Sequence, residues 1–271
     1  MYPKIRQQFI EDLQVLSKQY QESEPFPHIV LDNFFTEEIL DKVLSNFPNL
    51  EGKNKKSTIQ FNAEAGIKST SKGEALFNGI SKDFMYFLNS ETFLLWLQEL
   101  TGIKEKLISD PYFNGGGFHE IRRGGLLKIH ADYNKHPETK LDRRINLLIY
   151  LNKDWKEEYG GHVELWSKDM QTCYKKILPL FNRIVIFNTL TNSYHGHPEP
   201  LSCPEYISRK SIAVYYFSNG RPLNEVHQEH TTIYKRRPGV RELKSGIKGV
   251  LKLFIPPIFL PSTLKKLINT K

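Results

Sequence analysis

The sequence predicts an α+β fold in which supporting N-terminal helices precede a jelly roll of two facing β-sheets. Three observations predict it. Apolar residues recur at helical spacing up to about residue 105 and at strand spacing beyond it. Glycine pairs separate the short extended runs, as in turns and bulges between strands. The 271 residues, 39% of them hydrophobic and 25% charged, suit one folded domain with a packed core.

We therefore expect a single domain over residues 1–234, with helical support in 1–105 and the jelly-roll core in 106–234. A basic and apolar tail follows at residues 235–271. No internal repeat of solenoid length is visible, which argues against a repeat architecture.

The N-terminal part shows four amphipathic patterns, each with an apolar stripe at a period of 3.6 residues. Thr36 is expected to cap the second helix, and Gly102 to end the fourth. A short strand is expected at 28–31, and the polar segment 51–71 reads either as a substrate-facing loop or as an ordinary surface insertion, with one short strand near 58–61. The predicted helices cover residues 4–22, 36–44, 73–88 and 91–100.

The second half is predicted to supply about eight strands, enough for two facing sheets of a jelly roll. Each run is short, and the glycine clusters at 115–117 and 124–125 mark turns or bulges between the first of them. The expected strands are 118–121, 126–132, 145–151, 162–166, 174–177, 183–188, 195–199 and 211–217.

The formal net charge of +8 is concentrated in the tail. Residues 235–271 hold ten of the 38 Lys and Arg residues and one of the 30 acidic residues, so they carry +9 and the remainder carries −1. The domain therefore gives no charge-based support for nucleic-acid binding, and no nucleic-acid partner is expected. The mixed basic and apolar tail fits either peripheral contact with an anionic membrane or apolar side chains that cover the barrel.

Cysteine usage and hydropathy indicate where the protein resides. Only Cys173 and Cys203 occur, which makes a disulfide framework improbable and a reducing cytoplasm the expected setting. No run reaches the roughly 18 consecutive apolar residues of a membrane span, and the first residues lack the apolar run of a secretory signal. We expect a cytoplasmic protein, with the tail as its candidate membrane contact.

The chemistry is predicted to centre on His130-Ala131-Asp132. Residues i and i+2 of a strand face the same side, so the His130 imidazole and the Asp132 carboxylate would point into one space. A third imidazole, chosen as His195, would complete a two-histidine, one-carboxylate face that leaves positions open on an Fe(II) ion. His197 is the rival third ligand, because it lies two residues from His195 and would share its face in an extended segment.

Arg209 follows His195 by fourteen positions and begins an alternating run. Its planar guanidinium can bind a carboxylate through two parallel hydrogen bonds. Ser211, Ala213 and Tyr215 share its side of the predicted strand, and one side of that strand would line the barrel. A solvated surface arginine is the plainer alternative.

The ordered set of motifs resembles the 2-oxoglutarate and Fe(II)-dependent oxygenases of the prolyl 4-hydroxylase type. The resemblance covers roughly residues 106–218, with a looser likeness in 27–47. It consists of Gly-Gly-Leu-Leu-Lys-Ile-His-Ala-Asp, Arg-Ile-Asn-Leu-Leu-Ile-Tyr-Leu-Asn, Gly160-Gly161, Asn-Arg-Ile-Val-Ile-Phe, His195 and Arg-Lys-Ser-Ile-Ala-Val-Tyr-Tyr. The family pattern favours His195 over His197 as the third ligand.

The resemblance implies a double-stranded β-helix core and, as cofactors, Fe(II), the co-substrate 2-oxoglutarate and O2, with ascorbate as a further candidate. It implies that Arg209 and the Tyr150 hydroxyl hold the C5 carboxylate of 2-oxoglutarate. Ser211 and His119 are weaker candidates for contact with the co-substrate, each with a structural role as the alternative. His130, Asp132 and His195 are then both the metal ligands and the catalytic set.

The expected activity is hydroxylation of an unactivated C–H bond with release of succinate and CO2. The substrate would be a prolyl residue, an amino acid or a small molecule. The polar residues that flank the predicted metal strand could meet it or could simply be solvated. The alternative is a non-catalytic jelly-roll module that binds a metal or a ligand. The flanking residues are Arg122, Arg123, Tyr133, Asn134, Arg143 and Arg144.

Overall fold

The computed structural model describes residues 3–50, 58–63, 66–71 and 73–239. Most of the basic tail, residues 240–271, lies outside the described residues, as does the predicted membrane contact.

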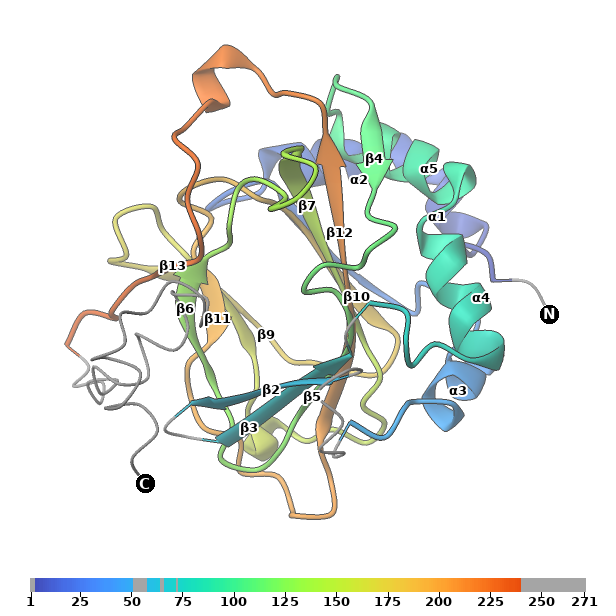
Figure 1. Cartoon of the computed structure of the whole chain (residues 1–271). Coiled ribbons are helices and arrows are strands. Elements are labelled where there is room, and N and C mark those ends of the chain that lie inside the picture. Colours follow the sequence, from blue (N-terminus) through green and yellow to red (C-terminus); the bar gives the residue numbers. More distant parts are fainter. Residues whose placement is uncertain (1–2, 51–57, 64–65, 72, 240–271) are drawn as a thin grey trace, which may run out of the picture.

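Five helices lie together on one side of the molecule, where they cover the outer face of the larger sheet (Figure 1). The indole nitrogen of Trp96 donates to the carbonyl of Phe9 (3.0 Å), which ties the last helix to the first. Gly102 ends that last helix in a left-handed conformation, as its sequence predicts. The helices are α1 (Gln8–Glu11), α2 (Leu13–Glu22), α3 (Glu37–Ser45), α4 (Gly79–Leu88) and α5 (Glu91–Thr101).

Three details of the helical predictions are wrong. The first pattern is two helices, because the backbone at Asp12 leaves the helical region. The predicted helix over 73–88 begins only at Gly79, because Gly73 has a positive φ and begins a turn. Thr36 precedes α3 in an extended conformation, but its side chain makes no capping hydrogen bond.

Two antiparallel sheets form the jelly roll, which confirms the predicted fold class. The larger sheet has eight strands, in the order β1-β10-β7-β12-β5-β3-β2 with β4 on β12, and the smaller has the order β13-β6-β11-β8-β9. The larger sheet contains β1 (His28–Asp32), β2 (Thr58–Ala63), β3 (Gly66–Ser71), β4 (Leu107–Ser109), β5 (Gly117–Ile121), β7 (Asp142–Tyr150), β10 (Arg183–Asn188) and β12 (Arg209–Ser218). The smaller contains β6 (Leu127–Ala131), β8 (Val163–Trp166), β9 (Cys173–Ile177), β11 (His195–His197) and β13 (Ile233–Tyr234).

Strands that the sequence did not reveal extend both sheets. The described parts of 51–71 form a hairpin of two strands, β2 and β3, instead of a loop with one strand, and β3 pairs with β5. Strand β4 pairs with the end of β12, and β13 pairs with β6. With β1, these additions place three strands of the N-terminal part in the larger sheet.

The alternation along the central strands separates two apolar layers. Ile145, Leu147 and Ile149 of β7 face the helices, in the main core. Tyr150 lies in a second cluster between the sheets, with Leu148 packed against it. Only alternate side chains of each strand therefore point into the barrel, and Arg209 of β12 is one of them.

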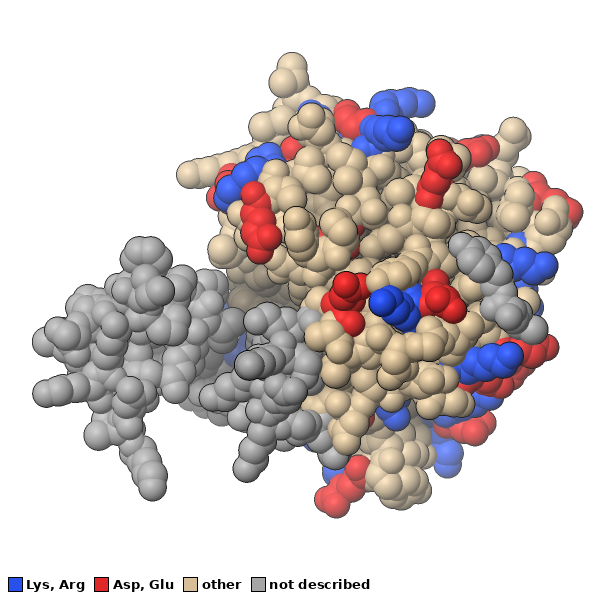
Figure 2. Space-filling view, turned by 45° about the vertical axis from the view of Figure 1, so that its right-hand side comes forward, with Lys and Arg blue, Asp and Glu red and all other residues tan. Residues whose placement is uncertain are grey.

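Within the described residues, no helix has the length and apolar composition that crossing a membrane requires. Figure 2 shows Lys and Arg interspersed with Asp and Glu on the face it presents.

Candidate active site

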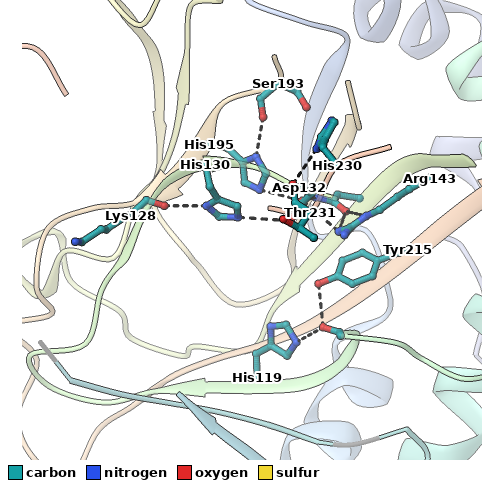
Figure 3. A network of polar contacts seen from close by, with 12 residues as sticks. His119, Lys128, His130, Asp132, Arg143, Ser193, His195, Tyr215, His230 and Thr231 are labelled. Carbon is teal, nitrogen blue, oxygen red and sulfur yellow. Dashed lines mark hydrogen bonds and ion pairs between the residues drawn. The ribbon is translucent and has the colours of Figure 1, made fainter. Parts of the chain in front are cut away.

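Two neighbouring strands of the smaller sheet bring the predicted metal-binding residues together. β6 and β11 run antiparallel, and His130 and His195 are direct partners across them. Asp132 follows β6 and points to the same side as His130 (Figure 3). The Nε2 atoms of His130 and His195 lie 3.5 and 3.4 Å from the Asp132 carboxylate oxygens. One ligand atom from each of the three residues lies within 4.8 Å of the others.

Backbone hydrogen bonds orient both imidazoles. Nδ1 of His130 lies 2.8 Å from the carbonyl of Lys128, and Nδ1 of His195 lies 2.9 Å from the carbonyl of Ser193. A carbonyl only accepts, so each Nδ1 carries the proton and each Nε2 presents a lone pair to the shared space. This is the tautomer that a metal-binding histidine needs, held in place before any ion binds.

The Asp132 carboxylate is held in its charged form. Its Oδ2 accepts hydrogen bonds from Arg143 (3.2 Å) and from the Asn146 amide (2.6 Å). Burial alone would raise the pKa of this carboxyl, but the Arg143 guanidinium and the neighbouring imidazoles outweigh burial and hold the pKa well below its usual range.

Burial favours the neutral form at His195 too, and there it decides the outcome. Desolvation, together with repulsion from His130, lowers the pKa of His195 to about 4, although Asp132 opposes this shift. The His195 ring lies 4.6 Å from the Phe187 ring and 4.5 Å from the His130 ring. Both imidazoles therefore sit beside an anionic carboxylate, and His195 is neutral near pH 7, as metal ligation requires.

The structure separates His195 from His197. The register between β11 and β6 shifts between these residues, so His197 pairs with Leu127 and not with a residue in step with His130. His197 is buried but is not a member of the three-residue cluster. Spacing alone could not distinguish the two histidines, because a regular strand would have placed both on one face.

A second polar group lies on the larger sheet. The Arg209 Nε donates to the Gly161 carbonyl (2.9 Å), and its Nη2 donates to the Tyr150 hydroxyl (3.2 Å). Both side chains are buried, and among the described residues no carboxylate pairs with Arg209. Desolvation therefore lowers the pKa of Arg209, although Tyr150 partly offsets this effect. A Cβ at Gly161 would lie 3.0 Å from the Arg209 Cδ, so this glycine leaves room for the guanidinium.

One continuous face of β7 and β12 joins the two groups. Asn146, which contacts Asp132, lies four residues before Tyr150, a separation of about 13 Å along an extended strand. Between them Leu148 is paired with Ala213, and Ser211 is the partner of Tyr150. Small side chains on β12 thus lie between the Asp132 carboxylate and the Arg209 guanidinium.

His119 and Arg144, predicted as contacts for the co-substrate and the substrate, bind other groups of the protein. The His119 ring donates to the Gly115 carbonyl (3.1 Å), beside the Tyr215 hydroxyl in Figure 3. Arg144 pairs with Glu105 and Glu225 on the opposite face of β7.

Of the remaining flanking residues, Arg123 donates to backbone carbonyls of the 202–203 loop. Asn134 binds backbone groups of residues 228 and 230. Arg143 is the flanking residue that contacts the Asp132 carboxylate, and the Tyr133 ring lies against the Arg143 guanidinium.

Three side chains at the site were missed by sequence reasoning: Asn146, Tyr215 and Tyr234. Asn146 contacts Asp132, and Tyr215 stacks on Arg143. The Tyr234 ring lies 5.7 Å from the His130 ring, because β13 pairs with β6. Strand alternation offered a signal for two of them, because Asn146 lies on the side of Tyr150 in its strand and Tyr215 lies on the side of Arg209.

The donor set fits the two groups that the sequence resemblance implies. Two neutral imidazoles and one carboxylate form the face preferred by non-haem Fe(II) in oxygenases. A buried guanidinium without a carboxylate partner suits an anionic ligand, because an uncompensated buried charge is costly. The Tyr150 hydroxyl accepts from Arg209, so its own proton remains available to that ligand.

Comparison with known proteins agrees with this chemistry. The sequence model of the 2OG-Fe(II) oxygenase superfamily matches residues 116–217, a segment that contains all five of these residues. The chain is 25% identical over 230 residues to prolyl 3-hydroxylase OGFOD1 of Mus musculus; the match covers 78% of this chain and only 38% of that protein.

Two solved structures share the fold. One is a prolyl 4-hydroxylase of Pseudomonas putida (TM-score 0.53, 11% identity, 75% of this chain and 99% of that one). The other is a prolyl hydroxylase of Trichoplax adhaerens in complex with a hypoxia inducible factor peptide fragment (TM-score 0.54, 18% identity, 79% and 94%). The family match over residues 116–217, the shared jelly roll and the His-Asp-His cluster agree, and together they support a prolyl-hydroxylase-like oxygenase of the 2OG-Fe(II) superfamily, a family that uses Fe(II), 2-oxoglutarate and O2.

Proposed function

We propose that the protein hydroxylates a prolyl residue of a peptide or protein, with His130, Asp132 and His195 as the iron ligands. One observation carries the ligand assignment: three residues from two strands present ligand atoms within 4.8 Å of one another, and the tautomers of both imidazoles are already fixed. A ferrous ion held there together with 2-oxoglutarate would supply the oxidising power that transfers one oxygen atom of O2 to a C–H bond and the other to succinate, with loss of CO2.

The proposed role of Arg209 and Tyr150 is to bind the far carboxylate of 2-oxoglutarate. Arg209 offers a charged donor and Tyr150 a neutral one, and both belong to rigid strands. A diacid anchored at this end would lie along the face of Leu148 and Ala213, which leads toward Asn146 and Asp132. Ser211 is the nearest additional polar candidate, because it is the strand partner of Tyr150.

The apolar residues that surround Tyr150 support this role. Val163, Leu165 and Phe187 form a buried cluster around Tyr150, which limits the access of water to the co-substrate. In such surroundings the Arg209 charge attracts a carboxylate more strongly than it would in water. The protein's contribution is thus to bind, orient and exclude water.

A prolyl substrate is proposed on the basis of the relatives. The Mus musculus protein is named a prolyl 3-hydroxylase, and the Trichoplax adhaerens enzyme is in complex with a peptide fragment. The chain spans about two fifths of the length of the first, so the activity and partners of that whole protein do not transfer to this one directly. A free amino acid or another small molecule is the alternative outcome of the test.

The test is succinate production by the purified full chain with Fe(II), 2-oxoglutarate and O2, across a set of proline-containing peptides and free amino acids. Mass spectrometry of the substrate then locates the added oxygen atom. We expect substrate-dependent succinate formation that is lost in His130→Ala. The matched control is His162→Ala, which removes a histidine whose Nε2 pairs with Glu157 at the surface.

Two results would contradict the proposal in different ways. Hydroxylation of a free amino acid but of no peptide would replace the substrate class and leave the iron site intact. Binding of metal and 2-oxoglutarate without succinate from any substrate in the set would indicate a non-catalytic binding module.

A further inference from the structure

Arg143 is buried inside the barrel beside the Asp132 carboxylate, with a side-chain exposure of only 1%. A buried arginine is costly unless its charge is paired and its donors are satisfied. Arg143 meets both conditions through two residues. It forms an ion pair with Asp132 (3.2 Å), and its Nε and Nη2 both donate to the Asn146 side-chain carbonyl.

A β-bulge accounts for this orientation. Residues on β7 alternate, and Ile145, Leu147 and Ile149 face the helices, so a regular strand would also aim Arg143 at the helices. The pairing of β7 with β12 shifts register at this point: Tyr216 pairs with Ile145, but Phe217 pairs with Arg143. Arg144 is the extra residue. The bulge therefore turns Arg143 inward and Arg144 outward to Glu105.

Two tyrosine rings hold the guanidinium between them. The Arg143 Cζ lies 3.5 Å from the centroid of Tyr215 and 4.4 Å from that of Tyr133. Both tyrosines are anchored at their other end, because their hydroxyls donate to successive carbonyls, those of Gly115 and Asn114 (3.0 Å each). The plane of Arg143 is therefore fixed by stacking on two sides and by the loop behind the rings.

The carboxylate that Arg143 contacts is divided between two tasks. Oδ2 accepts from Arg143 and from Asn146, and Asn146 itself is oriented by Arg143. Oδ1 lies 3.5 Å from the His130 Nε2, and Oδ2 also lies 3.4 Å from the His195 Nε2. Both oxygens therefore border the three-residue cluster, but Arg143 and Asn146 donate to Oδ2, which leaves Oδ1 with more lone-pair capacity for a metal ion.

We propose that Arg143, clamped between Tyr133 and Tyr215, is a positioning residue that fixes the Asp132 carboxylate to offer one oxygen to the metal. The inference rests on the proposed function, because it presupposes that Asp132 is an iron ligand. A carboxylate that binds through one oxygen occupies one coordination position, so more positions remain for 2-oxoglutarate and O2 than with a two-oxygen mode. The paired guanidinium also offsets the carboxylate charge in the interior.

The experiment measures divalent metal affinity directly, without turnover. Mn(II) binding to the full chain is titrated by electron paramagnetic resonance, with and without 2-oxoglutarate, for the wild type, Arg143→Gln and Arg143→Lys. We expect Arg143→Gln to weaken Mn(II) binding by about 10- to 100-fold, the usual loss when a partner of a metal ligand is removed. Arg143→Lys should fall between them, because lysine restores the charge but not the planar stacked fork.

The matched control is Arg144→Gln. Arg144 is the next residue of the same strand, is also buried, and is also paired with carboxylates, but it lies on the other face. If Arg143 only stabilised the fold, Arg143→Gln and Arg144→Gln would change the Mn(II) affinity equally. We therefore expect Arg144→Gln to lower the melting temperature and to leave the Mn(II) affinity of the folded protein unchanged.

The outcomes separate this inference from the function on which it depends. If the wild type binds Mn(II) and Arg143→Gln binds it equally well, or loses no more affinity than Arg144→Gln, Arg143 does not position Asp132, and the proposed iron site still stands. If the wild type itself binds no Mn(II), the iron site is wrong and the inference ends with it. If Arg143→Gln does not fold, Arg143→Lys and Tyr215→Leu, which removes one stacking ring, decide by the same affinity comparison.

Discussion

Two buried arginines mark the two ends of the barrel interior, and their surroundings differ. Arg143 lies at the metal end, paired with Asp132 and stacked between two tyrosine rings. Arg209 lies at the far end, where the described residues offer it a carbonyl and a hydroxyl but no carboxylate. Burial acts to lower the pKa of both. At Arg143 the Asp132 charge reverses the shift and raises the pKa, whereas at Arg209 the shift stays downward.

The difference indicates that Arg143 and Arg209 have different roles. A guanidinium whose charge is already compensated contributes to the folded protein itself. A buried guanidinium that lacks a counter-charge is suited to bind an anion. The free-energy cost of burying its charge is partly offset only when the anion binds. The comparison therefore predicts which substitutions harm the empty protein and which harm only the binding of the co-substrate.

The largest effect should come from the metal end. His130→Ala or Asp132→Ala removes a proposed iron ligand, so succinate formation should fall to background, a greater loss than the roughly 10- to 100-fold that follows removal of a ligand's hydrogen-bond partner. The measurement is 2-oxoglutarate turnover at saturating iron, with His197→Ala as the comparison. Activity retained in Asp132→Ala, or an equal loss in His197→Ala and His195→Ala, would contradict the ligand assignment.

The next effect tests the contrast in stability. In protein free of metal and co-substrate, Arg143→Met should lower the free energy of unfolding by about 3–5 kcal/mol, because it leaves the Asp132 carboxylate buried without its counter-charge. Arg209→Met removes no ion pair, and its cost should stay within about 1 kcal/mol. Urea denaturation of both variants measures the difference. Equal losses would show that the two arginines are equivalent in the empty protein.

Arg209→Gln should have a large effect on the binding of 2-oxoglutarate, although Arg209 matters less than Arg143 for the stability of the empty protein. Loss of a charged partner in a buried pair costs about 2–5 kcal/mol, so the KM for 2-oxoglutarate should rise roughly 30- to 5,000-fold. Mn(II) affinity measured without 2-oxoglutarate should not change. An unchanged KM, or a parallel loss of metal affinity, would place the co-substrate elsewhere.

Tyr150→Phe should give the smallest effect. It removes one neutral hydroxyl and keeps the ring against Arg209 (4.9 Å from the Arg209 Cζ). A single such hydrogen bond contributes about 0.5–1.5 kcal/mol, so the KM for 2-oxoglutarate should rise about 2- to 13-fold. Competition by succinate or glutarate gives an independent reading of the same pocket. No change in either quantity would remove Tyr150 from the co-substrate site.

Much of the site was predictable because it depends on local geometry. His130 and Asp132 share a face because they are two residues apart in an extended segment. Arg209 was identified from its planar guanidinium at the start of an alternating run, and Tyr150 only from the resemblance to the family motifs. The helices and strands of the core were predicted for the same reason, since their apolar periodicity is written in the sequence. Errors lie where a turn residue overrides the pattern, as at Gly73.

What the sequence did not reveal depends on pairing between distant segments. Strands β3, β4 and β13 are defined by the strands beside them, and Tyr234 reaches His130 only through such a pairing.

The sequence by itself predicted the fold class, the His-Asp pair and Arg209 from residue type and period, and it predicted Tyr150 through the resemblance to the family. Only the tertiary structure distinguished His195 from His197 and aimed Arg143, not Arg144, at the carboxylate. In both cases the physical reason is a shift in strand register, which reverses the alternation of faces and depends on the partner strand.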